Sequence, residues 1–343
     1  MGSECNAALK SGCRPSPTRM KTFNAFRIHE KSAGVEPLTL EQLSTGEVVI
    51  RVQWSGINYK DALAVTGKGR IVRRFPLVGG VDLAGVVESS SSAEFSAGDA
   101  VLVTGCGLSE TRDGGYAQFA RVPAEAVVRL PDGFTTRDAM AIGTAGFAAA
   151  LAIMQLEHNG LAPGQGPVAV TGASGGVGCI AIDMLSCRGY EVVAFSRKRE
   201  AAPLLTSLGA GEVRSDAPGG DRPLEAERWA GAIDNVGGAV LSQLLRGARM
   251  QAGVAAVGLA GGSGLDVSLM PFLLRGVNLL GVNSAATTRP KRLAVWARIA
   301  GDLRPRHLAR IAPSVITMDE LPKACEAIIS GSHTGRTLVR IDS

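Results

Sequence analysis

The chain has 343 residues, which suits two domains better than one core. It is 45% hydrophobic and 20% charged, so it is neither disordered nor fibrous. Its net charge of +5 is spread along the sequence and only 4% of its residues are aromatic, which argues against a nucleic-acid-binding surface.

The six cysteines form no CxxC pair, which argues against a disulfide framework and a zinc ribbon. The most apolar stretch, around 139–156, contains Gly143 and Gly146 and is interpreted as a core helix, so no membrane span is expected. Residues 1–19 lack the apolar core of a secretory signal and are predicted to form a disordered tail. We therefore expect a cytoplasmic protein, with organelle targeting by this tail left open.

From residue 21 to about 131 the pattern is one of short strands. Alternating or apolar runs separated by Ser- and Gly-rich turns predict a mostly antiparallel, barrel-like region with strands at 47–54, 81–88, 99–104, 115–122 and 126–130. The period then changes, and residues 136–154 are Ala-rich with helical spacing, with Thr135 or Thr136 as N-cap.

From Gly166 onward, predicted strands and helices alternate. Strands are expected at 167–171, 191–195, 230–234 and 253–258, and helices at 176–188 and 200–208. This βαβ series indicates a parallel sheet covered on both faces. Strand-like segments at 314–317 and 336–341 are expected to return to the first domain. The predicted division is 20–140 with 310–343, and 141–309.

The strongest motif is Thr171–Gly178 (TGASGGVG), between a buried strand and a helix. Glycines in such a loop allow a tight turn and close approach of the backbone to a pyrophosphate, which the helix N-terminus then binds. Because Ala173 stands at the usual first glycine position, the motif is a variant of the dinucleotide fingerprint. No lysine follows the loop, which excludes a P-loop.

The next strand ends in Ser196-Arg197-Lys198, where an NAD-binding protein would carry a carboxylate. A hydroxyl and two cations suit a 2′-phosphate, so NADP(H) is favoured over NAD(H). Further cofactor contacts are expected at the carboxyl ends of the strands, from Asn235, Leu259, Gly262 and Ser284. The predicted loop contacts are Gly172, Ser174, Gly175, Gly176, Val177 and Gly178.

Several motifs together resemble the medium-chain dehydrogenase/reductase superfamily: Trp54–Asp61 (WSGINYKD), Gly80–Gly85 (GVDLAG), Gly143–Phe147 (GTAGF) and the glycine loop. Within it, the chain from about 20 to 341 resembles the acryloyl-CoA (acrylyl-CoA) reductase family of the AcuI/YhdH type. That likeness rests on four shorter motifs, at 59–63 (YKDAL), 66–69 (TGKG), 270–272 (MPF) and 335–338 (GRTL).

The resemblance implies a GroES-like β-barrel domain and a Rossmann domain, and a homodimer. It also implies NADPH-dependent reduction of the C=C bond of an α,β-unsaturated acyl-CoA, with acryloyl-CoA giving propionyl-CoA. The zinc-ligand positions of the superfamily's alcohol dehydrogenases correspond here to Asn58, Asp61, Val81 and Asp82, which lack the thiolate and imidazole, so a metal-free site is expected.

Hydride delivery to the alkene carbon then requires donors for the developing oxyanion and a proton for the α-carbon. We expect Asn58 to supply an N–H to the oxyanion, and Tyr59 to donate the proton or to orient the cofactor. Asp61 is expected to orient these two side chains or to form one end of a proton path. Arg336 is expected to approach the cofactor or substrate. The cations Lys68, Arg70, Arg73 and Arg74 are candidates for the phosphates of coenzyme A.

Two alternatives remain at this point. The first is an NADPH-dependent quinone or enone reductase, for which the cations of residues 68–74 would be dispensable. The second is a non-catalytic NADPH-binding protein with a structural or nucleic-acid role, although neither a nucleic-acid partner nor a membrane is expected.

Overall fold

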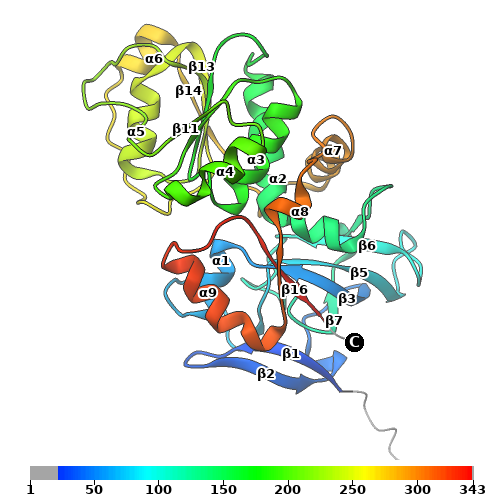
Figure 1. The fold of residues 1–343 in the computed structure, drawn as a ribbon. Helices are drawn as coiled ribbons and strands as arrows, with labels where there is room; N and C mark the ends of the chain where they lie inside the picture. Colours follow the sequence, from blue (N-terminus) through cyan, green and yellow to red (C-terminus); the bar gives the residue numbers. More distant parts are fainter. Residues whose placement is uncertain (1–21, 342–343) are drawn as a thin grey trace, which may run out of the picture.

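The computed structural model describes residues 22–341, and the predicted tail at 1–19 lies outside them. The chain forms two lobes, with the blue and red segments in one and the green and yellow segments in the other (Figure 1). The predicted fold class, a GroES-like β domain with a Rossmann domain, is confirmed.

The first lobe contains two sheets. The smaller has three antiparallel strands in the order β2(Ala33–Leu38)-β1(Phe23–Ile28)-β4(Leu77–Val78). The larger has the order β15(Ser314–Ile316)-β16(Thr337–Arg340)-β3(Val48–Gly56)-β5(Asp82–Ser90)-β6(Ala100–Thr104)-β8(Val128–Arg129), with β7(Phe119–Val122) also paired to β3. Alternation of buried and exposed residues along β3 places one face of this sheet on the core, as the sequence pattern predicts.

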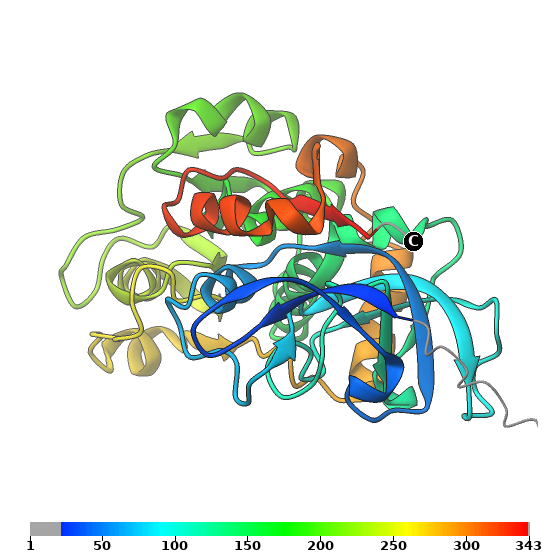
Figure 2. The ribbon, with the colours of Figure 1, turned by 90° about the horizontal axis from the view of Figure 1, so that it is seen from below.

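The last two strands join the sheet of the first lobe, since β16 pairs antiparallel with β3. Helix α9(Leu321–Ile329), between β15 and β16, packs against α1(Tyr59–Val65). Seen from below, the red C-terminal segment runs beside the blue strands, and β16 pairs with β3 there (Figure 2). Residues more than 270 positions apart therefore meet here.

The second lobe is a parallel six-stranded sheet. Its order is β11(Glu212–Arg214)-β10(Val192–Phe195)-β9(Val168–Thr171)-β12(Trp229–Asp234)-β13(Ala248–Ala256)-β14(Asn278–Gly281). Separate apolar cores on its two faces place α2(Thr136–His158) and α3(Gly176–Cys187) on one face, and α5(Gly238–Arg246) and α6(Met270–Arg275) on the other. The remaining helices are α4(Ala202–Ser207), α7(Arg289–Ala300) and α8(Leu308–Ile311).

Helix α2(Thr136–His158) connects the lobes. It kinks at Gly143, whose φ of +51° is one that glycine adopts without steric cost. Within residues 22–341 this is the one helix long and apolar enough to cross a membrane, and 83% of its most apolar window is buried. That burial is typical of the core helix predicted from the sequence.

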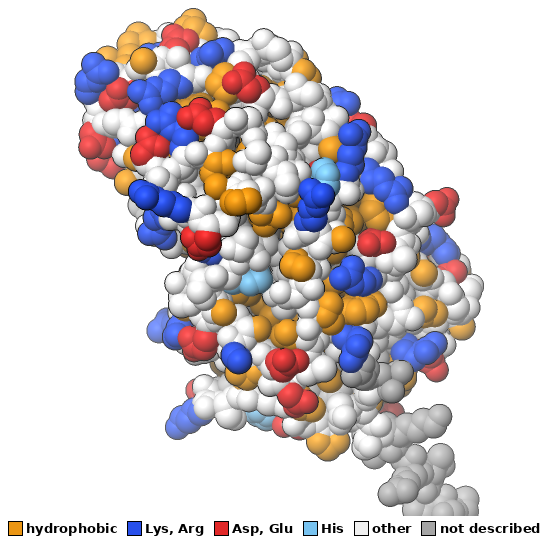
Figure 3. Space-filling model, in the orientation of Figure 1, with side chains coloured by type: hydrophobic (Ala, Val, Ile, Leu, Met, Phe, Trp, Pro, Cys, Tyr) orange, Lys and Arg blue, Asp and Glu red, His pale blue; other side chains and the backbone are white. Residues whose placement is uncertain are grey.

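Most predicted strands and helices are present, but their lengths differ in places. The strand expected at 115–122 pairs with β3 only from Phe119, while Tyr116 and Gln118 hydrogen-bond to the backbone of β1. The segment after Asn58, for which the sequence predicts no helix, begins helix α1(Tyr59–Val65). The space-filling view shows charged side chains of both signs scattered over both lobes (Figure 3).

Candidate active site

The glycine loop lies between β9 and α3, as predicted. Gly172 has a φ of +57°, and a Cβ on Gly178 would lie 2.6 Å from the backbone of Ala173. The loop therefore needs glycine at both positions, one for the turn and one for the close packing of helix and strand. Helix α3 begins at Gly176 and directs its free N–H groups toward the loop. This cradle fits the pyrophosphate of a dinucleotide.

The loop is in contact with the segment that leads into β16. The Gly335 N–H donates to the Ser174 carbonyl at 2.8 Å, and Gly175 and Gly335 form an isolated β-bridge. The Lys198 ammonium donates to the backbone carbonyl of His333. The two lobes are thus joined at the cradle itself.

The loop after β10 contains the residues predicted to bind the 2′-phosphate. The Ser196 hydroxyl donates to the Ser174 hydroxyl at 3.1 Å and accepts from the Lys198 N–H at 3.2 Å. Arg197 is exposed beside them, while partial burial lowers the pKa of Lys198. A hydroxyl, an ammonium and a guanidinium therefore lie within three residues at the edge of the cradle.

The other predicted cofactor residues lie at the carboxyl edge of the sheet. Asn235 donates to the Thr171 carbonyl at 2.8 Å, and its buried Oδ1 has no hydrogen-bond partner. Gly262 bridges to Gly237, and Ser284 lies half-buried in the turn after β14. The orphaned Asn235 oxygen and the glycine cradle together indicate an edge that is suited to a polar ligand.

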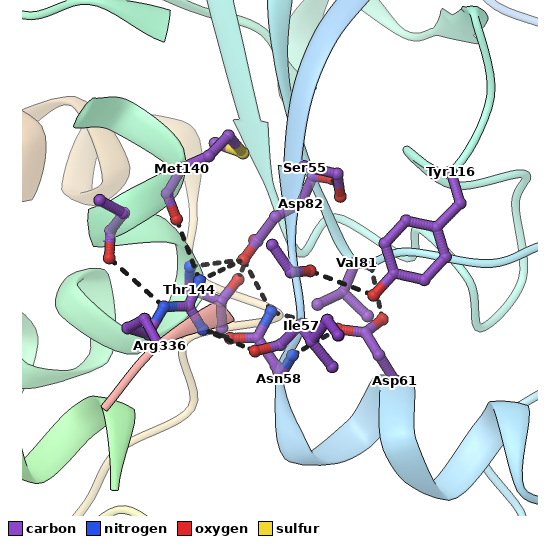
Figure 4. A network of polar contacts seen from close by, with 12 residues as sticks. Ser55, Ile57, Asn58, Asp61, Val81, Asp82, Tyr116, Met140, Thr144 and Arg336 are labelled. Carbon is purple, nitrogen blue, oxygen red and sulfur yellow. Dashed lines mark hydrogen bonds and ion pairs between the residues drawn. The ribbon is translucent and has the colours of Figure 1, made fainter. Parts of the chain in front are cut away.

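At the junction of the lobes lies a buried polar network centred on Asp82 and Arg336 (Figure 4). Asp82 is fully buried, and its carboxylate accepts from the N–H and hydroxyl of Thr144 and from the Asn58 amide. The Arg336 guanidinium lies 3.7 Å from the same carboxylate. Thr144 follows the kink of α2, so the helix geometry brings it to Asp82.

Arg336 does not point out of the site, which differs from the expected approach to cofactor or substrate. Its side chain is 2% exposed, and its N–H groups donate to the Asn58 Oδ1 and to main-chain carbonyls of Ile57, Met140 and Ala141. With Asp82 beside it, every donor of the guanidinium faces a protein acceptor. In this structure Arg336 positions the neighbouring segments.

Asn58, which we expected to supply an N–H to the oxyanion, is similarly occupied. Its Nδ2 donates to Asp82 at 2.7 Å and to Asp61 at 3.2 Å, while its Oδ1 accepts from Arg336 at 2.7 Å. Asn58 is also the N-cap of α1. Both amide hydrogens are therefore directed at carboxylates, and none is left for a ligand.

Asp61 completes the capping box of α1. Its carboxylate accepts from the Asn58 N–H at 2.8 Å and from the Val81 N–H at 2.9 Å. Burial, and next the nearby charge of Asp82, raise the pKa of Asp61 to about 7. The ring of Tyr116, fully buried, lies beside it, and its hydroxyl donates to the Gly56 carbonyl.

Tyr59 contrasts with these buried groups. It is the first residue of α1 and 42% exposed. No hydrogen bond of its hydroxyl is described within residues 22–341. Among the three predicted catalytic side chains, Tyr59 is thus the one whose polar group is free to meet a ligand.

The four cations proposed for coenzyme A divide into two kinds. Lys68 pairs with Glu326 at 2.7 Å, and Arg74 donates to Ser44 and the Thr111 carbonyl. Arg70 and Arg73 are exposed, and no side-chain ion pair is described for either within residues 22–341. These two arginines are the members of the group that are available to a phosphate.

The site does not fit zinc. Val81 offers no ligand atom, Asn58 directs its amide N–H groups inward, and the Asp82 carboxylate is already surrounded by donors. Across residues 22–341, no group of three or more His, Cys, Asp and Glu side chains could hold a metal ion.

Sequence reasoning missed Thr144 and Tyr116 as members of the network and His333 as a contact of the cradle. Thr144 stands in the GTAGF motif, directly after the kinked glycine, which was a usable signal. Tyr116 and His333 carry no local signal, because the residues they contact, Gly56 and Lys198, are distant from them in the sequence.

The raised pKa of Asp61 predicts a pH dependence of stability. The folded chain holds this proton more tightly than the unfolded chain, so the contribution of Asp61 is fully present below about pH 4 and is lost as the pH rises through about 7. Asp61→Asn removes this titration, and we expect its destabilisation relative to the wild type to be smaller at pH 8 than at pH 5. Denaturant unfolding at both pH values measures the difference, and a destabilisation that grew toward pH 8 would contradict the assignment.

Two families match this chain. Residues 44–132 match the family described as "Alcohol dehydrogenase GroES-like domain", and residues 176–298 match "Zinc-binding dehydrogenase". A Ruegeria pomeroyi protein named "Acrylyl-CoA reductase AcuI" is 48% identical over 94% of this chain and 100% of its own length.

Solved structures with the same fold include those of two bacterial relatives. The yhdH oxidoreductase of Salmonella enterica, in complex with NADP, has a TM-score of 0.90 at 45% identity, covering 93% of this chain and 100% of that one. The Bacillus subtilis protein yhfP, with NAD bound, has a TM-score of 0.90 at 42% identity, covering 94% and 100%. The identity, its extent and the shared two-lobed fold show that the chain belongs to the acrylyl-CoA reductase (AcuI/YhdH) family of the medium-chain dehydrogenase/reductase superfamily.

Proposed function

We propose that this protein reduces the C=C bond of an α,β-unsaturated acyl-CoA with NADPH, converting acryloyl-CoA to propionyl-CoA. The observation that carries the proposal is the 48% identity, over the whole length of the relative, to a protein named an acrylyl-CoA reductase. The homodimer stays a prediction, for which Leu273 and Leu274, exposed on the helix α6 that precedes the edge strand β14 in the chain, offer a surface.

NADPH is the cofactor that the cradle and the loop after β10 suit best. The Salmonella relative is described with NADP and the Bacillus relative with NAD. The preference of this chain for one of the two cofactors is therefore argued from its own residues. Ser196, Arg197 and Lys198 provide donors and positive charge, with no carboxylate to repel a 2′-phosphate.

The double variant Arg197→Ala, Lys198→Ala tests the cofactor. We expect it to weaken NADPH binding by about tenfold or more and NADH binding much less, because the two differ in one phosphate. Fluorescence titration of both nucleotides gives the two dissociation constants. Equal losses for both would refute the 2′-phosphate assignment.

When bound, the reduced nicotinamide supplies the hydride. We infer that the Tyr59 hydroxyl, exposed at the start of α1, supplies the proton to the α-carbon. The network of Asn58, Asp61, Asp82 and Arg336 holds the first turn of α1 in place, since Asn58 and Asp61 form its capping box. In this proposal their role is to position Tyr59 and the adjoining backbone.

Replacing Tyr59 with Phe keeps the ring and removes the proton. We expect kcat to fall by about 10²-fold or more, the usual effect of losing a general acid, while NADPH affinity stays nearly unchanged. Steady-state kinetics combined with NADPH titration separate the two effects. If kcat is unaffected, another group donates the proton.

Arg70 and Arg73 are the proposed contacts of the coenzyme A phosphates. Both are exposed on the segment after α1, on the same lobe as Tyr59. Arginine suits phosphate because its planar donors bind two oxygens at once.

The alternative is a quinone or enone reductase acting on a neutral electrophile. It is favoured by one observation: the Bacillus relative, 44% identical over 90% of this chain and 95% of its own length, is named a putative quinone oxidoreductase. The two candidates share the cofactor and differ in the need for positive charge near the site.

Comparing substrates distinguishes the two candidates. With NADPH, we expect kcat/KM to be highest for acryloyl-CoA, compared with crotonyl-CoA, a simple enone and a quinone. Reversing the charges in Arg70→Glu, Arg73→Glu should raise the KM for acryloyl-CoA about tenfold at low salt and leave the enone unaffected.

Arg228→Glu is the matched control, because Arg228 is exposed at the amino end of β12, away from the ligand-binding edge. It should leave all four substrates unaffected. Faster turnover of the quinone than of either acyl-CoA, with no effect of the charge reversal, would favour the alternative.

A further inference from the structure

A second buried arginine connects the lobes on the α7 side of the junction. Arg292 of α7 is 1% exposed. Its Nη1 donates to the carbonyl and hydroxyl of Thr104, at the end of β6 in the first lobe. Its Nη2 donates to the carbonyls of Ala285 (3.5 Å) and Thr287 (3.3 Å), in the turn after β14 in the second lobe.

No carboxylate forms an ion pair with Arg292 within residues 22–341. Its guanidinium instead lies over the ring of Phe147 on α2, 5.1 Å from the centroid. Phe147 is one helical turn beyond Thr144, the residue of α2 that binds Asp82. The planar fork of arginine suits this arrangement, because its donors reach acceptors on two sides of one buried position.

On the side of the first lobe, Arg292 holds the strand end that lies next to the buried network. Thr104 is the register partner of Asp82 in the pairing of β5 with β6. The turn that follows packs directly on the second lobe: the Cys106 N–H donates to the Ala285 carbonyl, and a Cβ on Gly105 would lie 2.9 Å from the Ala285 Cα. The turn after β14 therefore has a fixed position relative to Asp82.

On the side of the second lobe, the strand order shows which half of the cofactor would meet this turn. The glycine cradle follows β9, and the loop suited to the 2′-phosphate follows β10 on one side of it. A dinucleotide that crosses the sheet edge must therefore place its nicotinamide half on the other side, over β12, β13 and β14. Residues 283–287 follow β14 and belong to that half.

We propose that Arg292 is a positioning residue that sets the turn of residues 283–287 against the first lobe and so shapes the nicotinamide half of the cofactor site. The inference rests on the proposed function, because it takes NADPH as the ligand. It assigns to Arg292 no contact with cofactor or substrate.

Arg292→Lys tests the proposal, since lysine keeps the charge but cannot reach acceptors on both sides. Calorimetric titration of the full chain would compare NADPH with 2′-phospho-ADP-ribose, which lacks the nicotinamide. We expect the dissociation constant of NADPH to rise about tenfold, because a small displacement of residues 283–287 would misplace the groups that meet the nicotinamide. The dissociation constant of 2′-phospho-ADP-ribose should stay within about twofold of the wild-type value. The unchanged affinity for the second ligand also shows that the variant is folded.

Arg289→Lys is the matched control. Arg289 lies on the same helix and crosses the same junction, but its Nη1 donates to the carbonyls of residues 124, 125 and 127, and its Nη2 pairs with Glu94. We expect this variant to bind both ligands like the wild type.

Three outcomes would overturn the proposal: equal weakening of both ligands by Arg292→Lys, no weakening of either, or the same selective loss in Arg289→Lys. A wild-type chain that bound neither ligand would overturn the proposed cofactor, and the inference with it. The wild-type titration thus separates failure of the function from failure of the inference.

Discussion

The buried contact between Arg336 and Asp82 is the constraint on which the site depends. Both side chains are almost fully removed from water, and a buried charge persists only if its partners are placed around it. Losing one partner of such a pair typically costs about 3–5 kcal/mol, because the other charge is left uncompensated. The partners come from the end of β3, the start of β5, the kinked helix α2 and the segment before β16, so these distant parts of the chain must converge.

This arrangement explains why the positions that correspond to zinc ligands in the superfamily's alcohol dehydrogenases have a structural task here. Asn58, Asp61 and Asp82 satisfy one another and Arg336, and they leave no lone pairs arranged for a metal. What faces outward is Tyr59, at the beginning of a helix that this network caps. The polar residues of the motif thus support the position of a neighbour, and Tyr59, the residue to which we assign the proton, is 42% exposed.

The cofactor cradle and the network are mechanically connected. Gly335 bonds to the glycine loop, and the next residue, Arg336, enters the network. Gly176 of the loop leaves room for the Arg336 side chain, since a Cβ there would lie 2.7 Å from its Cδ. The segment that leads into β16 therefore connects the cofactor cradle with the buried network at the start of α1.

Much of this could be predicted from the sequence where a feature depends on neighbouring residues. Local structure could be predicted for the alternating pattern of 47–54, the apolar strand at 167–171 and the glycine loop. In each case the signal, burial on one face or backbone freedom, is a property of a short segment. Helix α1 was the exception, although the Asn58 and Asp61 spacing is that of a capping box.

By itself, the sequence determined the alternation of strands and helices, the dinucleotide loop, the basic residues beside it and the absence of a thiolate–imidazole set. Only the tertiary structure decided that Asn58 has no free N–H, that Arg336 faces inward and that Lys68 and Arg74 are already partnered. The physical reason is that hydrogen-bond donors and charges acquire their roles from whichever acceptors surround them. Those acceptors come from segments up to 279 positions away, as in the bond from Arg336 to Ile57.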